Sequence, residues 1–288
     1  MTYLIHEMKK NKIDSLIHIF GLAVIGVLVA MAYKLTFLWM YDRYMGADSY
    51  YSHGFLVPFV SLFFIYKQMD RLRQTEQKMN MVGVYIVFFA LFLHVLGTVL
   101  YIFSISGFSI FFLIIGLVLF LFGTKISGII WFPLLFLLFM FPLPMAVINL
   151  ISFPLKIFAA KAGVWIVSAL GVPVHGEGFN IYIPAGHLLV GNPCSGLRSL
   201  IAFLALGAVF AYLAPVGTVR KWILFFLTVP IALLSNVIRI PILILVSHNW
   251  GLEAASPDTF VHTGSGVLVF VIGFILLLAF AKVLEWRT

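Results

Sequence analysis

The sequence contains a single cysteine, Cys194, and the residues around it could make its thiol reactive. It follows Gly191-Asn192-Pro193, it precedes a long apolar run that begins at Leu200, and Arg198 comes four residues after it. A thiol becomes nucleophilic when a helix N-terminus or a nearby cation lowers its pKa, and we expect both here. The alternative is a small buried apolar side chain, which is the commonest role of a free cysteine. The local sequence leaves both interpretations open.

Arg239 is a second candidate because it interrupts a long apolar segment. A charge at the centre of a membrane helix costs about 2.5–3.5 kcal/mol on insertion scales, so such residues usually face a cavity and have a function. The alternative is a structural pairing with a carboxylate or with backbone carbonyls. Asn236, one helical turn earlier, could bond the arginine or a substrate, or could simply join two helices.

His262 is the third candidate, and it precedes Thr263-Gly264-Ser265-Gly266, where glycines permit close backbone approach. An imidazole with a pKa near neutral can take the proton of a thiol and return it to a leaving amine. The alternative is a solvated histidine at the membrane interface. His53, in Tyr51-Ser52-His53-Gly54, could line the same site or only cap a helix. The histidines are too dispersed for a metal-ligand motif, and HExxH, GxSxG, P-loop and GxGxxG patterns are missing, so we expect no metal and no cofactor.

The composition indicates what must position these residues. The chain is 63% hydrophobic and 10% charged, with a mean hydropathy of +1.13. Since about a quarter of the residues of an ordinary soluble domain are charged, this composition excludes that class. We expect one integral-membrane domain over residues 1–288, folded as an all-α polytopic transmembrane bundle. The net charge of +8 is typical of a membrane protein with basic cytoplasmic loops, and no pattern indicates a nucleic-acid partner.

Apolar runs of about 20 residues mark spanning helices. They predict about eight, at 13–33, 54–67, 81–102, 108–122, 126–141, 197–214, 222–246 and 264–284. The first is expected to remain uncleaved, because no small-residue cleavage site follows it. The segment 34–53 is mixed in composition, and we expect a turn near 104–107 and an end to the fifth helix at Pro142 and Pro144.

Two segments do not fit a spanning helix. Lys156 and Lys161 interrupt 145–170, so we expect an interfacial or re-entrant helix with both lysines directed outward. In 172–190, apolar and polar residues alternate around Ile181, and a turn signal follows at Pro184-Ala185-Gly186. This segment is expected to form a short extracytoplasmic β-hairpin directly before Cys194.

Charge bias orients the predicted bundle in the inner (plasma) membrane. Placing the N-terminal lysines in the cytoplasm also places the other basic loops there, provided that 145–170 does not cross. Those loops contain 67–78, Lys125, Arg220, Lys221, Lys282 and Arg287. Both termini are then cytoplasmic. His53, Cys194 and His262 fall on the extracytoplasmic face, and Arg239 lies toward the outer end of its helix, so we expect these residues to meet at one depth.

The motifs resemble those of the exosortase/archaeosortase family. The resemblance is carried by Cys-Ser-Gly-Leu-Arg-Ser at 194–199, Asn-Val-Ile-Arg-Ile at 236–240 and the histidine before the last helix. Tyr-Ser-His-Gly at 51–54 and Phe-Pro-Leu-Pro at 141–144 also match, so that the resemblance extends over most of the chain, from about residue 48 to 266.

The resemblance implies a membrane cysteine transpeptidase. Such enzymes act on exported proteins that end in a sorting tail, namely a short motif, a transmembrane helix and a basic cluster. They cleave near the motif and transfer the protein to another anchor, with a polysaccharide or a lipid as candidate acceptor. Carried over to this chain, Cys194 is the nucleophile, Arg239 the catalytic arginine and His262 the proton carrier. The supporting residues are Arg198, Asn236, His53, Ser195 and Gly196.

Two other functions remain open from the residues alone. A transporter or channel would explain Arg239 and Asn236 within the membrane and the prolines near 142–154, but it predicts an inverted repeat, and the sequence shows none. A non-enzymatic assembly factor for polysaccharide export predicts that Cys194 and His262 tolerate alanine.

Overall fold

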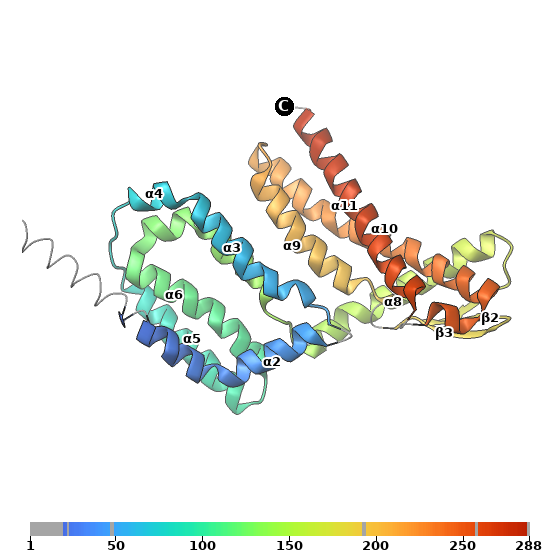
Figure 1. Cartoon of the computed structure of the whole chain (residues 1–288), viewed down its shortest axis with the longest axis horizontal. Coiled ribbons are helices and arrows are strands. Elements are labelled where there is room, and N and C mark those ends of the chain that lie inside the picture. Colours follow the sequence, from blue (N-terminus) through green and yellow to red (C-terminus); the bar gives the residue numbers. More distant parts are fainter. Residues whose placement is uncertain (1–19, 22, 47–48, 192–193, 257–258, 287–288) are drawn as a thin grey trace, which may run out of the picture.

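The computed structural model describes residues 20–21, 23–46, 49–191, 194–256 and 259–286, and these are mostly helical (Figure 1). The α-helices are Lys34–Met45 (α2), Leu56–Lys67 (α3), Met69–Arg73 (α4), Val82–Val99 (α5), Phe103–Ile129 (α6), Trp131–Phe136 (α7), Met145–Ala169 (α8), Leu197–Leu213 (α9), Thr218–Trp250 (α10) and Phe260–Trp286 (α11). The 3₁₀ helices are Ser52–Phe55 (η1), Leu137–Met140 (η2) and Leu252–Ala255 (η4), and the strands are His175–Glu177 (β1), Asn180–Ile183 (β2) and Gly186–Leu189 (β3). The N-terminal lysines, most of the first half of the expected span 13–33, and Arg287 lie outside the described residues.

The protein is a multi-pass helical membrane protein. Five helices, α5, α6, α8, α10 and α11, are long and apolar enough to cross a membrane, and Ala23–Ala32 with α2 would add a sixth if this pair, bent by 71°, forms one span. The sequence predicted about eight spans. The expected spans 54–67, 126–141 and 197–214 correspond to shorter apolar helices, whereas α8, expected to be interfacial or re-entrant, has the length and composition of a span.

Two predicted boundaries in the first half of the chain are wrong. Residues 104–107 form no turn, because α6 already begins at Phe103. The hydroxyl of Ser106 is hydrogen-bonded to the Thr36 hydroxyl at 2.6 Å and to His94 Nδ1 at 2.7 Å. This polar side chain is therefore satisfied inside the bundle and does not interrupt the helix. The expected helix 126–141 is also not continuous, because it starts inside α6 and resumes after Ile130 as α7 and η2. The segment 34–53, which is mixed in composition, is helical as α2 up to Met45.

The predicted hairpin is a three-stranded antiparallel sheet in the order β1-β2-β3. The expected strand alternation and turn are present, since Ile181 and Ile183 are buried and Ile183 pairs with Gly186 across the turn. The third strand, β1, was missed because His175-Gly176-Glu177 is exposed and has no apolar alternation.

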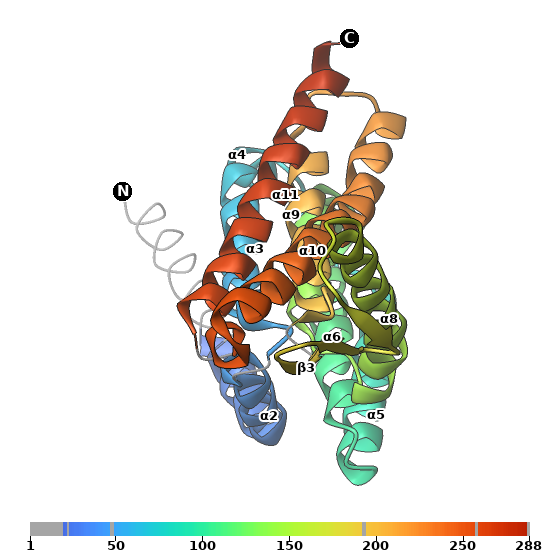
Figure 2. The ribbon, with the colours of Figure 1, turned by 90° about the vertical axis from the view of Figure 1, so that its right-hand side faces the viewer.

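The helices form two groups, which Figures 1 and 2 show from two sides. One contains α2 to α7, and the other contains α8 to α11 with the sheet. Helix α10 packs against α8, α9 and α11, so it is the centre of the second group. The two groups meet where the rings of Phe132 and Tyr212 stack with centroids 3.9 Å apart. The middle of α10 therefore lies next to the starts of α9 and α11.

Candidate active site

The thiol of Cys194 and the imidazole of His262 lie next to each other, although 68 residues separate them. Cys194 lies in the turn before α9, and His262 lies in the first turn of α11, so it is helical and not in the preceding loop as expected. The distance from Sγ to Nε2 is 3.9 Å. Both side chains are buried, at 5% and 9% exposed. The contact is therefore shielded from bulk water.

The surroundings of His262 determine which ring nitrogen carries the proton. Its Nδ1 lies 3.4 Å from the carbonyl oxygen of Ala255 in η4. A carbonyl only accepts, so Nδ1–H is the donor, and in the neutral ring Nε2 is left as an acceptor facing the sulfur. The backbone N–H of His262 donates to the Thr259 hydroxyl at 3.3 Å. The ring is thus oriented to receive a proton from the thiol.

Arg239 of α10 reaches the first turn of α11 and joins the same cluster. Its Nε donates to the Ser265 hydroxyl at 3.2 Å, and Nη2 donates to the His262 carbonyl at 3.1 Å. Ser265 in turn donates to that carbonyl at 2.8 Å. The guanidinium is only 8% exposed, so its charge acts in a poorly solvated environment, where electrostatic effects are strong.

Burial raises the pKa of the Cys194 thiol above its ordinary value, and the positive charges of Arg239 and Arg198 oppose this by lowering it. The sequence predicted a lowered pKa from a helix N-terminus and Arg198. That prediction is wrong for this structure because removal of the sulfur from water disfavours the thiolate more than the two charges favour it. The resting group is a thiol, so a nearby proton acceptor is needed to activate it.

Asn236 holds the turn that carries the cysteine. Its Nδ2 donates to the backbone carbonyl of Cys194 at 3.0 Å. Gly196 makes this approach possible, because it has φ +76°, and a Cβ there would lie 2.8 Å from Asn236 Cγ. The sequence suggested that Asn236 bonds the arginine or a substrate, or that it joins two helices. Its partner in this structure is the backbone of Cys194, and its own Oδ1 is buried without a hydrogen bond.

The remaining predicted site residues lie in two different parts of the molecule. The Ser195 hydroxyl accepts from the Leu197 N–H at 3.3 Å at the start of α9, and Arg198 is half-buried in the first turn of that helix. His53 lies in η1 of the other helix group, where it is hydrogen-bonded to the backbone of Phe139 and stacks near Tyr51. No contact found among the described residues brings His53 to the thiol.

Sequence reasoning missed Ser265, Thr259 and the Ala255 carbonyl. Ser265 had one usable signal, since it follows His262 by three residues and therefore shares a helix face with it. No sequence signal indicates the role of the Ala255 carbonyl, because every residue has a backbone carbonyl. Within the described ranges, no three His, Cys, Asp or Glu side chains are grouped as metal ligands would be.

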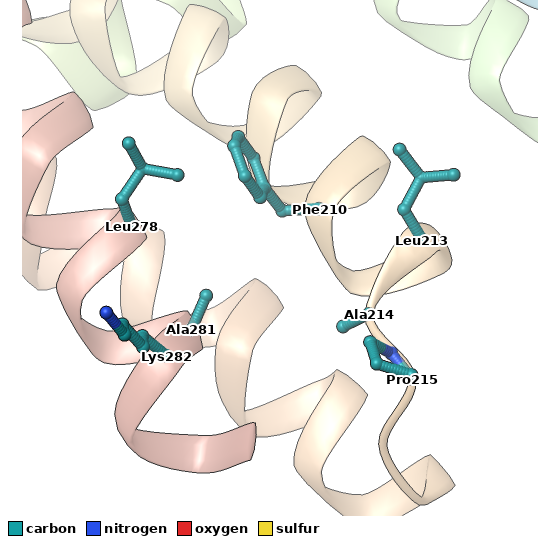
Figure 3. A pocket seen from close by; sticks show the side chains of 7 residues that line it. All are labelled: Phe210, Leu213, Ala214, Pro215, Leu278, Ala281 and Lys282. Carbon is teal, nitrogen blue, oxygen red and sulfur yellow. The ribbon is translucent and has the colours of Figure 1, made fainter. Parts of the chain in front are cut away.

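A groove of about 450 Å3 lies at the far ends of α9 and α11 (Figure 3). It is lined by Phe210, Leu213, Ala214, Pro215, Leu278, Ala281 and Lys282. Twenty residues of α11, or about 30 Å of helix, separate Lys282 from His262. This groove does not belong to the cluster around Cys194.

Comparison with known families identifies one match. A family model described as "Transmembrane exosortase (Exosortase_EpsH)" matches residues 39–279, which include Cys194, Arg239 and His262. No curated protein and no solved structure matches the chain.

Proposed function

The chain belongs to the transmembrane exosortase family, and we propose that it is a cysteine transpeptidase that removes C-terminal sorting tails from exported proteins. The observation that supports this most directly is the buried contact between Cys194 Sγ and His262 Nε2, next to the guanidinium of Arg239. A nucleophile, a proton acceptor oriented by a third group, and a fixed positive charge are what acyl transfer requires.

In the proposed reaction, His262 Nε2 takes the thiol proton, and the Cys194 thiolate attacks the scissile carbonyl of the substrate. The raised pKa of Cys194 makes this transfer necessary. The guanidinium of Arg239 stabilises the negative charge on the oxygen of the tetrahedral intermediate. The C–N bond then breaks, and the imidazolium gives its proton to the leaving amine of the tail. The substrate is left as a thioester on Cys194.

The second half of the reaction consumes the thioester. An incoming amine, hydroxyl or water attacks its carbonyl while His262 accepts the proton of the nucleophile, and the Cys194 thiol is regenerated. A polysaccharide or a lipid is the candidate acceptor for transfer. Shielding of the thiol favours transfer over hydrolysis, because little water reaches a side chain that is 5% exposed.

We propose that this chemistry takes place on the extracytoplasmic side of the inner (plasma) membrane, with both termini in the cytoplasm. The distribution of cations supports this orientation. Cys194 and His262 lie at the starts of α9 and α11, whereas Lys282 lies near the other end of α11 and Lys221 bonds the carbonyl of Tyr212 at the end of α9. Figure 1 shows α4, which carries two arginines, at the same side as the end of α11. Basic residues collect on the cytoplasmic side of membrane proteins.

The decisive experiment is mass spectrometry of an exported protein that ends in a motif, an apolar helix and a basic cluster, purified from cells with and without Cys194→Ala. We expect the tail to remain attached in the variant, with Cys194→Ser as a near-isosteric second variant. If Cys194→Ala is correctly inserted and still produces the shortened C-terminus at the normal level, the transpeptidase proposal is wrong. Transport or a non-enzymatic assembly role would then be favoured.

A further inference from the structure

Among the described residues, β3 is an edge strand, and no hydrogen bond is found to the backbone groups on its outer side. The sheet order β1-β2-β3 leaves β3 with one neighbour, β2. The Val190 N–H donates to the Phe179 carbonyl, so the pair 179–190 is a hydrogen-bonded one. In an antiparallel ladder such pairs alternate with non-bonded ones, and the register then makes 182–187 and 180–189 non-bonded. His187 and Leu189 therefore direct their N–H and C=O groups away from β2.

Both residues that direct their backbone groups outward are exposed. His187 is exposed, and Leu189 is 61% exposed. The neighbouring helix η4 lies on the opposite, buried face of the sheet, where Leu252 packs close to Gly186. Proteins usually block an open strand edge, because it accepts another extended chain.

The edge also leads directly to the nucleophile. After Leu189 the chain continues through buried Val190 to Gly191, whose carbonyl accepts the Cys194 N–H at 3.1 Å. Leu189 and Cys194 are five positions apart, which is at most about 17 Å of extended chain. A chain bound beside β3 would therefore have one end close to the thiol.

We propose that an extended segment of the substrate, just before its tail helix, binds as a fourth strand along β3 through the backbone groups of His187 and Leu189. The inference rests on the proposed function in one respect, namely that the substrate is a polypeptide. Backbone bonds of this kind supply affinity without regard to sequence, and alternate side chains supply selectivity. On the exposed face those side chains would meet His187 and its cross-strand neighbour Tyr182, whose rings lie 6.2 Å apart.

The lone cysteine makes the binding directly testable, because Cys194→Ala yields a chain without any cysteine. We would add Leu189→Cys to that variant and place single cysteines at successive positions of the segment before the tail of an exported protein, then oxidise the membranes. A bound strand predicts crosslinks at every second position. The control is Glu177→Cys, which is exposed on β1. Three strand spacings, or about 14 Å, separate β1 from an added strand, which is beyond the roughly 7 Å between Cα atoms that a disulfide can span.

A second measurement uses processing in the chain with native Cys194. Leu189→Pro removes the outward N–H, and proline is tolerated on an edge strand when that N–H does not serve the sheet. We expect tail cleavage by Leu189→Pro to be about fivefold slower than by Leu189→Ala, which also loses the leucine side chain but keeps the N–H, because the two variants differ by one hydrogen bond. If Leu189→Pro does not accumulate, the crosslinking experiment decides alone.

The outcomes separate the two proposals. Absent crosslinks, crosslinks that repeat every three or four positions, or equal yields from Glu177→Cys would overturn the added strand, even if cleavage depends on Cys194. Crosslinks at every second position support it. The crosslink pattern and the processing of the tail can also disagree. If crosslinks appear at every second position and the Cys194→Ala variant still processes the tail, the transpeptidase assignment is wrong and the strand interaction is supported.

Discussion

Replacing Gly196 with alanine tests whether Asn236 positions the nucleophile. Gly196 has φ +76°, a conformation that costs a residue with a Cβ roughly 1–2 kcal/mol. The new Cβ would also lie 2.8 Å from Asn236 Cγ, so Asn236 must move. Its 3.0 Å hydrogen bond to the Cys194 carbonyl is then lost. A net loss of about 0.5–1.5 kcal/mol for that bond corresponds to cleavage that is about 2- to 12-fold slower.

Gly171→Ala is the matched control. Gly171 has φ +81°, and nothing lies within 4 Å of a Cβ there, so the variant has the same backbone cost without touching Asn236. The assay is the rate of tail cleavage together with thermal unfolding of each purified variant. Both variants should lose the same backbone contribution to stability, Gly196→Ala should lose about 0.5–1.5 kcal/mol more with its hydrogen bond, and only Gly196→Ala should cleave more slowly. Equal cleavage by the two variants would refute the positioning role of Asn236, as would additive effects in the double variant Gly196→Ala/Asn236→Ala.

Two further predictions concern the charges and hydrogen bonds at the thiol. Arg239→Gln removes a positive charge that lowers the pKa of Cys194, so the pH at which alkylation of the thiol reaches half its maximal rate should move upward. An unchanged or lower midpoint would show that Arg239 does not act on the sulfur. Ser265→Ala removes the acceptor of Arg239 Nε, so cleavage should slow about 2- to 12-fold. Ser265→Thr, which keeps the hydroxyl, should cleave at close to the normal rate, and equal losses in both variants would indicate a packing effect instead.

The membrane class and the gathering of Cys194, Arg239 and His262 could be predicted from sequence, for different reasons. Composition determines the class, because so few charges cannot cover a soluble surface. The gathering was predicted by alternating eight spans across the membrane and by the resemblance, although three of those spans correspond to shorter apolar helices and α8 has the properties of a span. The partner of Asn236 could not be predicted, because it is a backbone carbonyl presented by a left-handed turn at Gly196. The direction of the Cys194 pKa shift depends on how deeply the sulfur is buried, and the neighbouring residues in the sequence do not reveal that burial.

The errors in the fold come from treating polar residues as breaks. Ser104 and Ser106 predicted a turn, but both are buried inside α6, and the Ser106 hydroxyl is bonded to other helices. Polar side chains persist in a membrane helix when neighbouring helices satisfy them. Two other features were missed because no local sequence pattern marks them. The break at Ile130 follows from tertiary packing, and the strand β1 follows from its pairing with β2.

The short helix η4 touches two parts of the molecule at once. Its Leu252 packs under the sheet, and its Ala255 carbonyl accepts a hydrogen bond from His262 Nδ1–H. A small displacement of the sheet is therefore passed on to the group that sets the angle of the imidazole. One turn of backbone thus joins the packing of the sheet to the orientation of the imidazole.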